Sequence, residues 1–148
     1  MKIAAGSDHA GYAVKQAVVR RLRSQGHEVA DVGTDSAETS VDYPTFAHRV
    51  AALVATGEAE RGLLVCGTGL GVCMAANRHR GVRAAVCNTP HLAEMSRRHN
   101  DANVLCLAGR LLSEDEAWAV TEVWMMTPFE AGRHSRRVEL IDEDGETQ

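Results

Sequence analysis

A glycine-rich turn in the middle of the chain is the strongest candidate for a functional site. It follows a short apolar run, precedes an amphipathic stretch, and consists of Cys66-Gly67-Thr68-Gly69-Leu70-Gly71. Glycines between a strand and a helix allow backbone N–H groups and the positive helix end to converge on an anion. A purely structural turn is the simpler alternative. The cysteine and the threonine beside the glycines favour a site for a phosphorylated metabolite.

Val72 excludes two familiar assignments of this turn. A dinucleotide fingerprint needs glycine at this position, and an acidic residue near the end of the following strand, which here ends Val86-Cys87-Asn88. A phosphatase loop of the form C-x5-R needs arginine at the same position. The glycines are also not followed by the lysine of a nucleotide-phosphate loop.

Cys66 is expected at the carboxyl end of a strand, where open α/β sheets bind their ligands. A thiol that faces a helix N-terminus is favoured as the thiolate. A papain-like nucleophile would need histidine and asparagine partners. The adjacent His99 and Asn100 cannot easily act as base and orienting group, and that class has a different fold. The remaining role for Cys66 is that of a general base.

Two further histidines stand where chemistry is expected. Asp8 and His9 directly follow the first predicted strand, so we expect them at the same sheet edge as Cys66. His99 closes a predicted helix before the fifth strand, where a plain helix terminus is the simpler interpretation. An imidazole changes its charge near neutral pH, which makes it the best available acid for a sugar ring oxygen.

Arg133 and Arg137 are four residues apart, so they share one face of a predicted final helix. Guanidinium groups placed in this way can hold a phosphate through charge-assisted hydrogen bonds. A solvated basic helix face is the alternative, and it is our interpretation of the neighbouring Arg136.

Composition restricts the classes of protein that fit. The chain of 148 residues suits a single domain, and its net charge of −4 argues against nucleic acid as a partner. No uncharged apolar run reaches the roughly 18 residues of a membrane span, and the N-terminus does not resemble a signal peptide. The four cysteines form no C-x-x-C pair, which argues against a metal site. Free thiols fit a cytoplasmic location.

Short apolar runs alternate with longer amphipathic stretches, which predicts an α/β fold. We expect a Rossmann-like three-layer α/β/α sandwich with a five-stranded parallel sheet. The predicted strands are Lys2–Gly6, Glu28–Val32, Gly62–Cys66, Arg83–Cys87 and Val104–Ala108. The predicted helices are Tyr12–Gln25, Asp42–Gly57, Val72–Arg78, His91–His99, Ser113–Met126 and Phe129–Ile141, before a frayed acidic tail at 142–148.

Five sequence blocks, taken together, resemble the type B ribose-5-phosphate isomerase family, which includes isomerases of allose and galactose 6-phosphates. The resemblance covers the chain from about Met1 to Leu140. The blocks are Gly6-Ser7-Asp8-His9-Ala10-Gly11, Asp42-Tyr43-Pro44, Cys66–Gly71, Ser96-Arg97-Arg98-His99-Asn100-Asp101-Ala102-Asn103 and Gly132-Arg133-His134. Any one of them alone would be weak evidence.

The resemblance implies an aldose–ketose isomerisation through an enediolate, without metal or cofactor. Cys66 would be the base, and the segment Gly67–Gly71 with Thr68 would stabilise the developing oxyanion. His99 would open the sugar ring and Asp8 would orient the sugar hydroxyls. The phosphate would be held by His9, Arg133 and Arg137, and the pocket would be completed by Asn100 and Arg110.

The resemblance also implies a partner, because family members are at least dimers whose pockets combine two chains. We therefore expect a homodimer or a dimer of dimers that takes a small sugar phosphate. A hexose 6-phosphate isomerase and a non-catalytic sugar-phosphate sensor remain the alternatives. Because the chain itself carries Cys66, His99 and both arginines, the galactose branch, which divides these residues between different subunits, fits less well.

Overall fold

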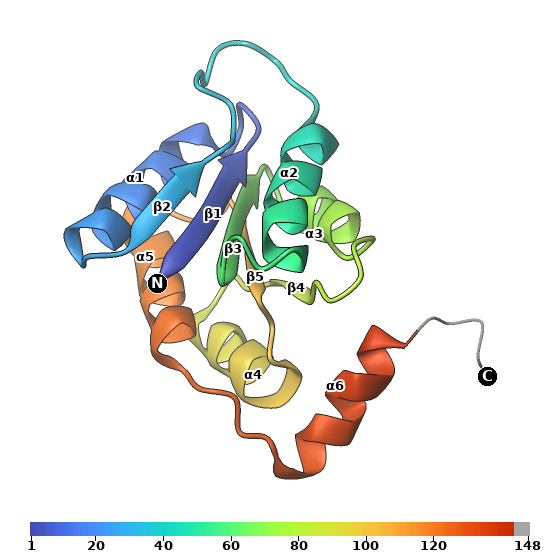
Figure 1. Ribbon diagram of the computed structural model, residues 1–148. Helices are drawn as coiled ribbons and strands as arrows, with labels where there is room; N and C mark the ends of the chain where they lie inside the picture. Colours follow the sequence, from blue (N-terminus) through green and yellow to red (C-terminus); the bar gives the residue numbers. More distant parts are fainter. Residues whose placement is uncertain (144–148) are drawn as a thin grey trace.

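Five parallel strands form one sheet at the centre of the molecule (Figure 1). The computed structural model describes residues 1–143. The sheet has the order β2-β1-β3-β5-β4. Its strands are β1 (Lys2–Ser7), β2 (Glu28–Asp31), β3 (Arg61–Cys66), β4 (Ala84–Val86) and β5 (Val104–Ala108).

Helices cover both faces of this sheet. Their bounds are α1 (Tyr12–Ser24), α2 (Tyr43–Ala55), α3 (Leu70–Ala76), α4 (Pro90–Asn100), α5 (Glu114–Met126) and α6 (Ser135–Asp142), with a 3₁₀ turn η1 (Gly132–His134). Helices α1, α4 and α5 pack on one face, and α2 and α3 pack on the other (Figure 1). This arrangement confirms the predicted Rossmann-like three-layer sandwich. No helix within residues 1–143 is long and apolar enough to cross a bilayer.

Strand β3 shows why the apolar runs become central strands. Leu63 and Val65 belong to the core on the side of α1 and α5, whereas Leu64 and Cys66 belong to the core on the side of α2 and α3. Successive side chains of a strand point to opposite faces, so a strand covered on both faces needs an unbroken apolar sequence. The same alternation places the Cys66 side chain, at the end of the strand, toward α2 and α3.

The last predicted helix is wrong in its extent. Residues 127–131 are not helical, and helical structure begins only at Gly132 with η1, followed by α6. Ala131, directly before η1, has a φ angle of 56°, which a right-handed helix does not allow, so the helix cannot extend back to Phe129. Helix α3 also begins at Leu70, two residues before the predicted start.

Helix α6 stands apart from the sheet and its two layers (Figure 1). Val138 is its one buried side chain, and Leu140 and Ile141 are about half exposed. An ion pair of 2.7 Å between Arg83 and Asp142 joins its end to the main body. Asp142 is thus helical, which corrects the predicted start of the frayed tail, and residues 144–148 lie outside the described part.

We expect Ser113→Ala to lower the free energy of unfolding by about 1 kcal/mol, because Ser113 caps α5. Its hydroxyl accepts from the Glu116 N–H at 3.2 Å, and the Glu116 carboxylate accepts from the Ser113 N–H at 2.8 Å. Urea unfolding followed by circular dichroism measures the change. The control is Ser40→Ala, an exposed loop serine, which should change stability by only a few tenths of that value. Equal effects of the two substitutions would contradict the capping role.

Candidate active site

A cavity of about 370 Å³ opens at the carboxyl edge of the sheet. Strands β1 and β3 are neighbours, so the loops that follow them meet at this edge. The cavity is lined by Asp8, His9, Ala10, Val41, Asp42, Tyr43, Cys66, Gly67, Thr68, Gly71 and Arg110. We call the seven predicted site residues among these the Cys66 group: Asp8, His9, Cys66, Gly67, Thr68, Gly71 and Arg110.

Cys66 is held firmly at the end of β3. Its side chain is 5% exposed, and the Gly69 N–H donates a hydrogen bond to Sγ at 3.2 Å. Its carbonyl accepts from the Gly109 N–H at 2.8 Å, which continues the pairing with β5. A backbone donor directed at the sulfur stabilises negative charge there, which is what a thiolate base requires.

Glycine is required at two positions of the turn. Gly69 has a φ of 77°, and a side chain there would also approach the Leu107 backbone to 3.1 Å. At Gly71, a Cβ would lie 2.5 Å from the ring of Tyr43, so the aromatic ring packs directly on the backbone of the turn. Thr68 is exposed, and its hydroxyl accepts from the Leu70 N–H at 3.4 Å. Leu70 itself begins α3 and is 53% exposed.

Asp8 and His9 are each fixed by a backbone donor. The buried Asp8 carboxylate accepts from the Gly11 N–H at 3.0 Å, which leaves oxygen lone pairs for a ligand. His9 Nδ1 accepts from the Val41 N–H at 3.2 Å. Because Nδ1 accepts, the proton of a neutral His9 ring is on Nε2, which makes Nε2 a donor.

A buried lysine fixes the start of the loop between β2 and α2. Lys15 is 1% exposed, pairs with Asp31 at 2.9 Å and donates to the Thr34 carbonyl at 2.9 Å. The bond between His9 and Val41 fixes the far end of the same loop. These contacts position the end of the loop, whose residues line the cavity.

Val41, Asp42 and Tyr43 line the cavity, although none of them was predicted as a site residue. Asp42-Tyr43-Pro44 was predicted as the start of a helix and as one of the five blocks that resemble the isomerase family. Helix α2 does begin at Tyr43, but the Asp42 side chain makes no capping hydrogen bond. The sequence did contain a signal for these lining residues. A helix that connects two parallel strands begins at the carboxyl edge of the sheet, so the predicted start of this helix already placed Asp42 and Tyr43 near the site.

The other three cysteines are placed mostly in the core, as predicted. Cys87 and Cys106 are buried, whereas Cys73 is half-buried on α3. Its thiol donates to the Ala84 carbonyl at 3.3 Å. A hydrogen bond with Cys106 lowers the pKa of Cys73 to about 7, and Cys73 lies outside the lining of the cavity.

His99 lies far from this cavity within one chain. Helix α4 leads from β4 to β5, so it begins near the carboxyl edge of the sheet and ends near the opposite edge. Its eleven residues make it about 16 Å long, and His99 is next to its last residue. The structure therefore does not bring Cys66 and His99 together in a single chain.

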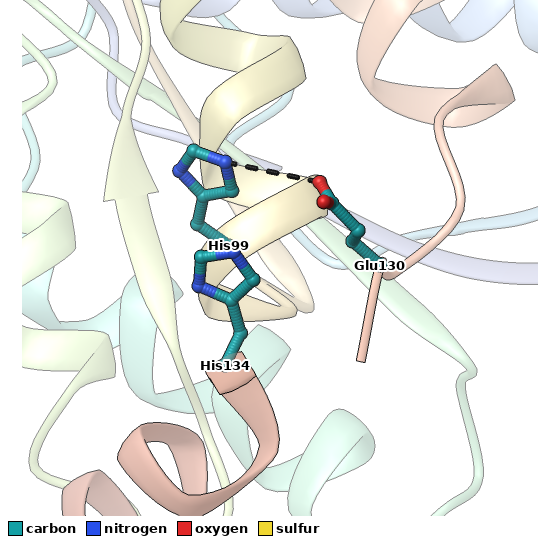
Figure 2. Close-up of side chains that lie close together, drawn as sticks. All are labelled: His99, Glu130 and His134. Carbon is teal, nitrogen blue, oxygen red and sulfur yellow. Dashed lines mark ion pairs between the residues drawn. The ribbon is translucent and has the colours of Figure 1, made fainter. Parts of the chain in front are cut away.

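His99 instead contacts the segment that precedes α6 (Figure 2). Its ring stacks on that of His134, with centroids 4.3 Å apart and planes inclined by 14°. Its Nε2 lies 3.9 Å from Oε2 of Glu130. Burial and the neighbouring His99 lower the pKa of His134, which favours the neutral imidazole.

Of the three predicted phosphate ligands, His9 lines the cavity at Cys66, whereas Arg133 and Arg137 are on the His99 side of the molecule. Arg133 lies in η1 and Arg137 in α6, rather than on one helix, and both are exposed. The Arg133 Nε donates to His134 Nε2 at 3.4 Å. Asn100 lines a different cavity, of about 630 Å³, between α6 and residues 77–85. We call His99, Asn100, Arg133 and Arg137 the His99 group.

Comparison with known proteins gives consistent matches along the whole chain. The ribose-5-phosphate isomerase B of Escherichia coli (strain K12) is 46% identical over 140 residues, which cover 95% of this chain and 93% of that protein. The structure of the Clostridium thermocellum ribose-5-phosphate isomerase B superposes with a TM-score of 0.94 at 48% identity, over 96% of this chain and 95% of that one.

A structure with a bound sugar phosphate is also similar. It is the Mycoplasma genitalium ribose-5-phosphate isomerase B with bound ribulose-5-phosphate, which is 36% identical, has a TM-score of 0.94 and covers 99% of this chain and 97% of its own. The family model described as Ribose/Galactose Isomerase matches residues 3–141. The chain therefore belongs to the ribose/galactose isomerase family.

Proposed function

We propose that the chain interconverts D-ribose 5-phosphate and D-ribulose 5-phosphate through an enediolate. The observation that carries the proposal is the Cys66 thiol, which accepts a backbone hydrogen bond at the floor of a cavity with Asp8 and His9 at its rim. The relatives that carry this activity in their names, and one that binds ribulose-5-phosphate, support the choice of substrate.

In this reaction the Cys66 thiolate removes the proton on C2 of the open-chain aldose. The electron pair of the C–H bond forms the C1=C2 double bond, and the carbonyl electrons move to O1. Return of the proton to C1, with transfer of the hydroxyl proton from O2 to O1, gives the ketose. C2 is oxidised and C1 reduced within one molecule, so atoms and electrons balance without another reactant. The Gly69 and Leu70 N–H groups already donate to Cys66 Sγ and to the Thr68 hydroxyl, so the other backbone N–H groups of residues 67–71, with the Thr68 hydroxyl, would stabilise the enediolate oxygen.

The remaining residues of the Cys66 group bind the sugar in this proposal. Asp8 accepts hydrogen bonds from the hydroxyls, because its carboxylate keeps lone pairs beyond the one that Gly11 uses. His9 offers its Nε2 donor to the phosphate. Arg110, whose side chain lies 3.2 Å from the position of a Cβ on Gly67, brings a positive charge to the same wall.

We further propose that a second copy of the chain completes each site. The cavity at the carboxyl edge has its own base, but His99, Arg133 and Arg137 are on the other side of the molecule. These three side chains are half exposed or exposed, and η1 and α6 project beyond the sheet layers (Figure 1). A two-fold dimer would present the His99 group of each chain to the Cys66 group of the other, and so form two equal sites.

We expect Cys66→Ala to lower kcat by about 10³-fold, because it removes the base. The measurement is a coupled assay with ribose 5-phosphate, with allose and galactose 6-phosphates for comparison; ribose 5-phosphate should have the highest kcat/KM. Cys73→Ala is the matched control, since it removes a half-buried thiol that does not line the cavity and should keep most of the activity. Full activity of Cys66→Ala, or a preference for a hexose phosphate, would contradict the proposal.

Mixing two inactive variants tests the shared site. We expect Cys66→Ala and His99→Ala, unfolded and refolded together, to recover about a quarter of the wild-type activity, since half of the dimers are mixed and one of their two sites is intact. Each variant refolded alone remains inactive. If the two residues worked within one chain, the mixture would show no recovery.

We expect Arg137→Ala to raise KM for the sugar phosphate at least about tenfold, because it removes a charge-assisted hydrogen bond to the phosphate. Arg136→Ala is the matched control: it removes an exposed arginine one position away and should leave KM within about twofold. Steady-state kinetics distinguish the two, and equal changes in both variants would indicate a general loss of positive charge rather than a specific phosphate ligand.

A further inference from the structure

The predicted ring-opening histidine, His99, and two side chains beside it form a set of potential metal ligands. One ring nitrogen of His99, one of His134 and a carboxylate oxygen of Glu130 all lie within 4.8 Å of one another. Figure 2 shows the two imidazole rings one above the other, with the carboxylate directed at His99. The proposed isomerase reaction uses His99 but has no role for Glu130.

The cluster is held in place by contacts outside the three side chains. The Glu130 N–H donates to the Arg98 carbonyl at 3.0 Å, and Glu130 Oε2 accepts from the Arg98 guanidinium at 3.1 Å. His134 is buried, with 5% of its surface exposed. The buried His134 is therefore fixed before an ion binds, whereas the more exposed His99 and Glu130 can adjust their side chains.

The donor set fits a borderline divalent ion. Two imidazoles and one carboxylate bind Zn²⁺ at about 2.0–2.2 Å and leave a fourth position open. Donor atoms around such an ion are about 3.4 Å apart, so atoms that are up to 4.8 Å apart must approach one another. The His99 ring must also turn out of its stack on His134, because an imidazole binds an ion in the plane of its ring. Side-chain rotations of His99 and Glu130 can provide this, because these two side chains are 36% and 43% exposed. The carboxylate has enough lone pairs to keep its bond to Arg98.

The positive charge around the cluster limits which metal ions can bind there. Arg98 and Arg133 both contact the cluster and oppose a cation. Weakly held, oxygen-preferring ions such as Mg²⁺ would not overcome this repulsion, whereas imidazole ligation favours Zn²⁺, Ni²⁺ and Cu²⁺.

We propose that His99, Glu130 and His134 bind a Zn²⁺-class ion, and that the bound ion inhibits the isomerase by occupying His99. The binding step stands apart from the proposed function, whereas the inhibition rests on it. The ion is an inhibitor at this site, and the reaction proposed above does not use it.

Calorimetric titration of the full chain with ZnCl₂, without substrate, tests the binding. We expect about one ion per chain, no detectable heat with MgCl₂, and affinity at least tenfold lower in Glu130→Gln and His134→Ala. His48→Ala and His91→Ala are the controls. His48 forms the other close histidine pair, with Nδ1 2.8 Å from His79 Nε2, and His91 is an exposed histidine at the start of α4. Both should bind as the wild type does.

Several outcomes would overturn the binding proposal: no binding of Zn²⁺, unchanged affinity in Glu130→Gln, or loss of binding in His48→Ala. Cobalt substitution separates this site from the thiols, because sulfur ligation adds an intense charge-transfer absorption that nitrogen and oxygen ligation lack. Such a band would also contradict the proposal. Glu130 is exposed, so Glu130→Gln tests the site even if His134→Ala fails to fold.

The inhibition is tested by activity at increasing ZnCl₂, with recovery on addition of EDTA. We expect Glu130→Gln to need at least tenfold more Zn²⁺ for half-inhibition than the wild type. Zinc that binds in the calorimeter but leaves turnover unchanged would overturn the inhibition and leave the binding site intact. A chain without isomerase activity would contradict the proposed function alone, because the calorimetry needs no substrate.

Discussion

The direction of the strands decides where every functional side chain lies. In a parallel sheet all strands end at one edge, and every helix that connects two strands begins near that edge and ends near the other. Asp8 follows β1, Cys66 ends β3 and Tyr43 begins α2, so all three meet at the carboxyl edge. The strand register makes β1, β3 and β5 end at the same height of the sheet, since Ser7 pairs with Val65 and Cys66 pairs with Ala108. His99 closes α4, so the same rule places it at the opposite edge.

This rule separates the Cys66 group from the His99 group within one chain, which is why we propose that two chains share each site. The proposal also gives α6 a role, because a helix with one buried side chain contributes little to the stability of its own chain. In the proposed dimer, α6 would carry the Arg137 guanidinium beyond the sheet layers to the other chain. Each chain would then supply one half-site at each edge of its sheet, and the exposure of Arg133 and Arg137 fits this arrangement.

Much of the fold could be predicted because its signals are local. The unbroken apolar run of β3, the Ser113 cap of α5 and the glycines after Cys66 are each determined by a few neighbouring residues. The final helix was predicted too long because the positive φ of Ala131 leaves no trace in residue type. The contact of Tyr43 with Gly71 and the approach of Glu130 to His99 join segments far apart in the sequence, which no pattern of spacing records.

The two roles proposed for His99, proton transfer and metal binding, both need an accessible ring nitrogen. The nearby His134 ring and Glu130 carboxylate add further donor atoms for a metal ion. The guanidinium groups of Arg98 and Arg133 act in the opposite direction, since they attract the phosphate of a substrate and repel a cation. If both proposals hold, the balance of these charges, rather than the number of donor atoms, would decide whether this cluster favours a sugar phosphate or a metal ion.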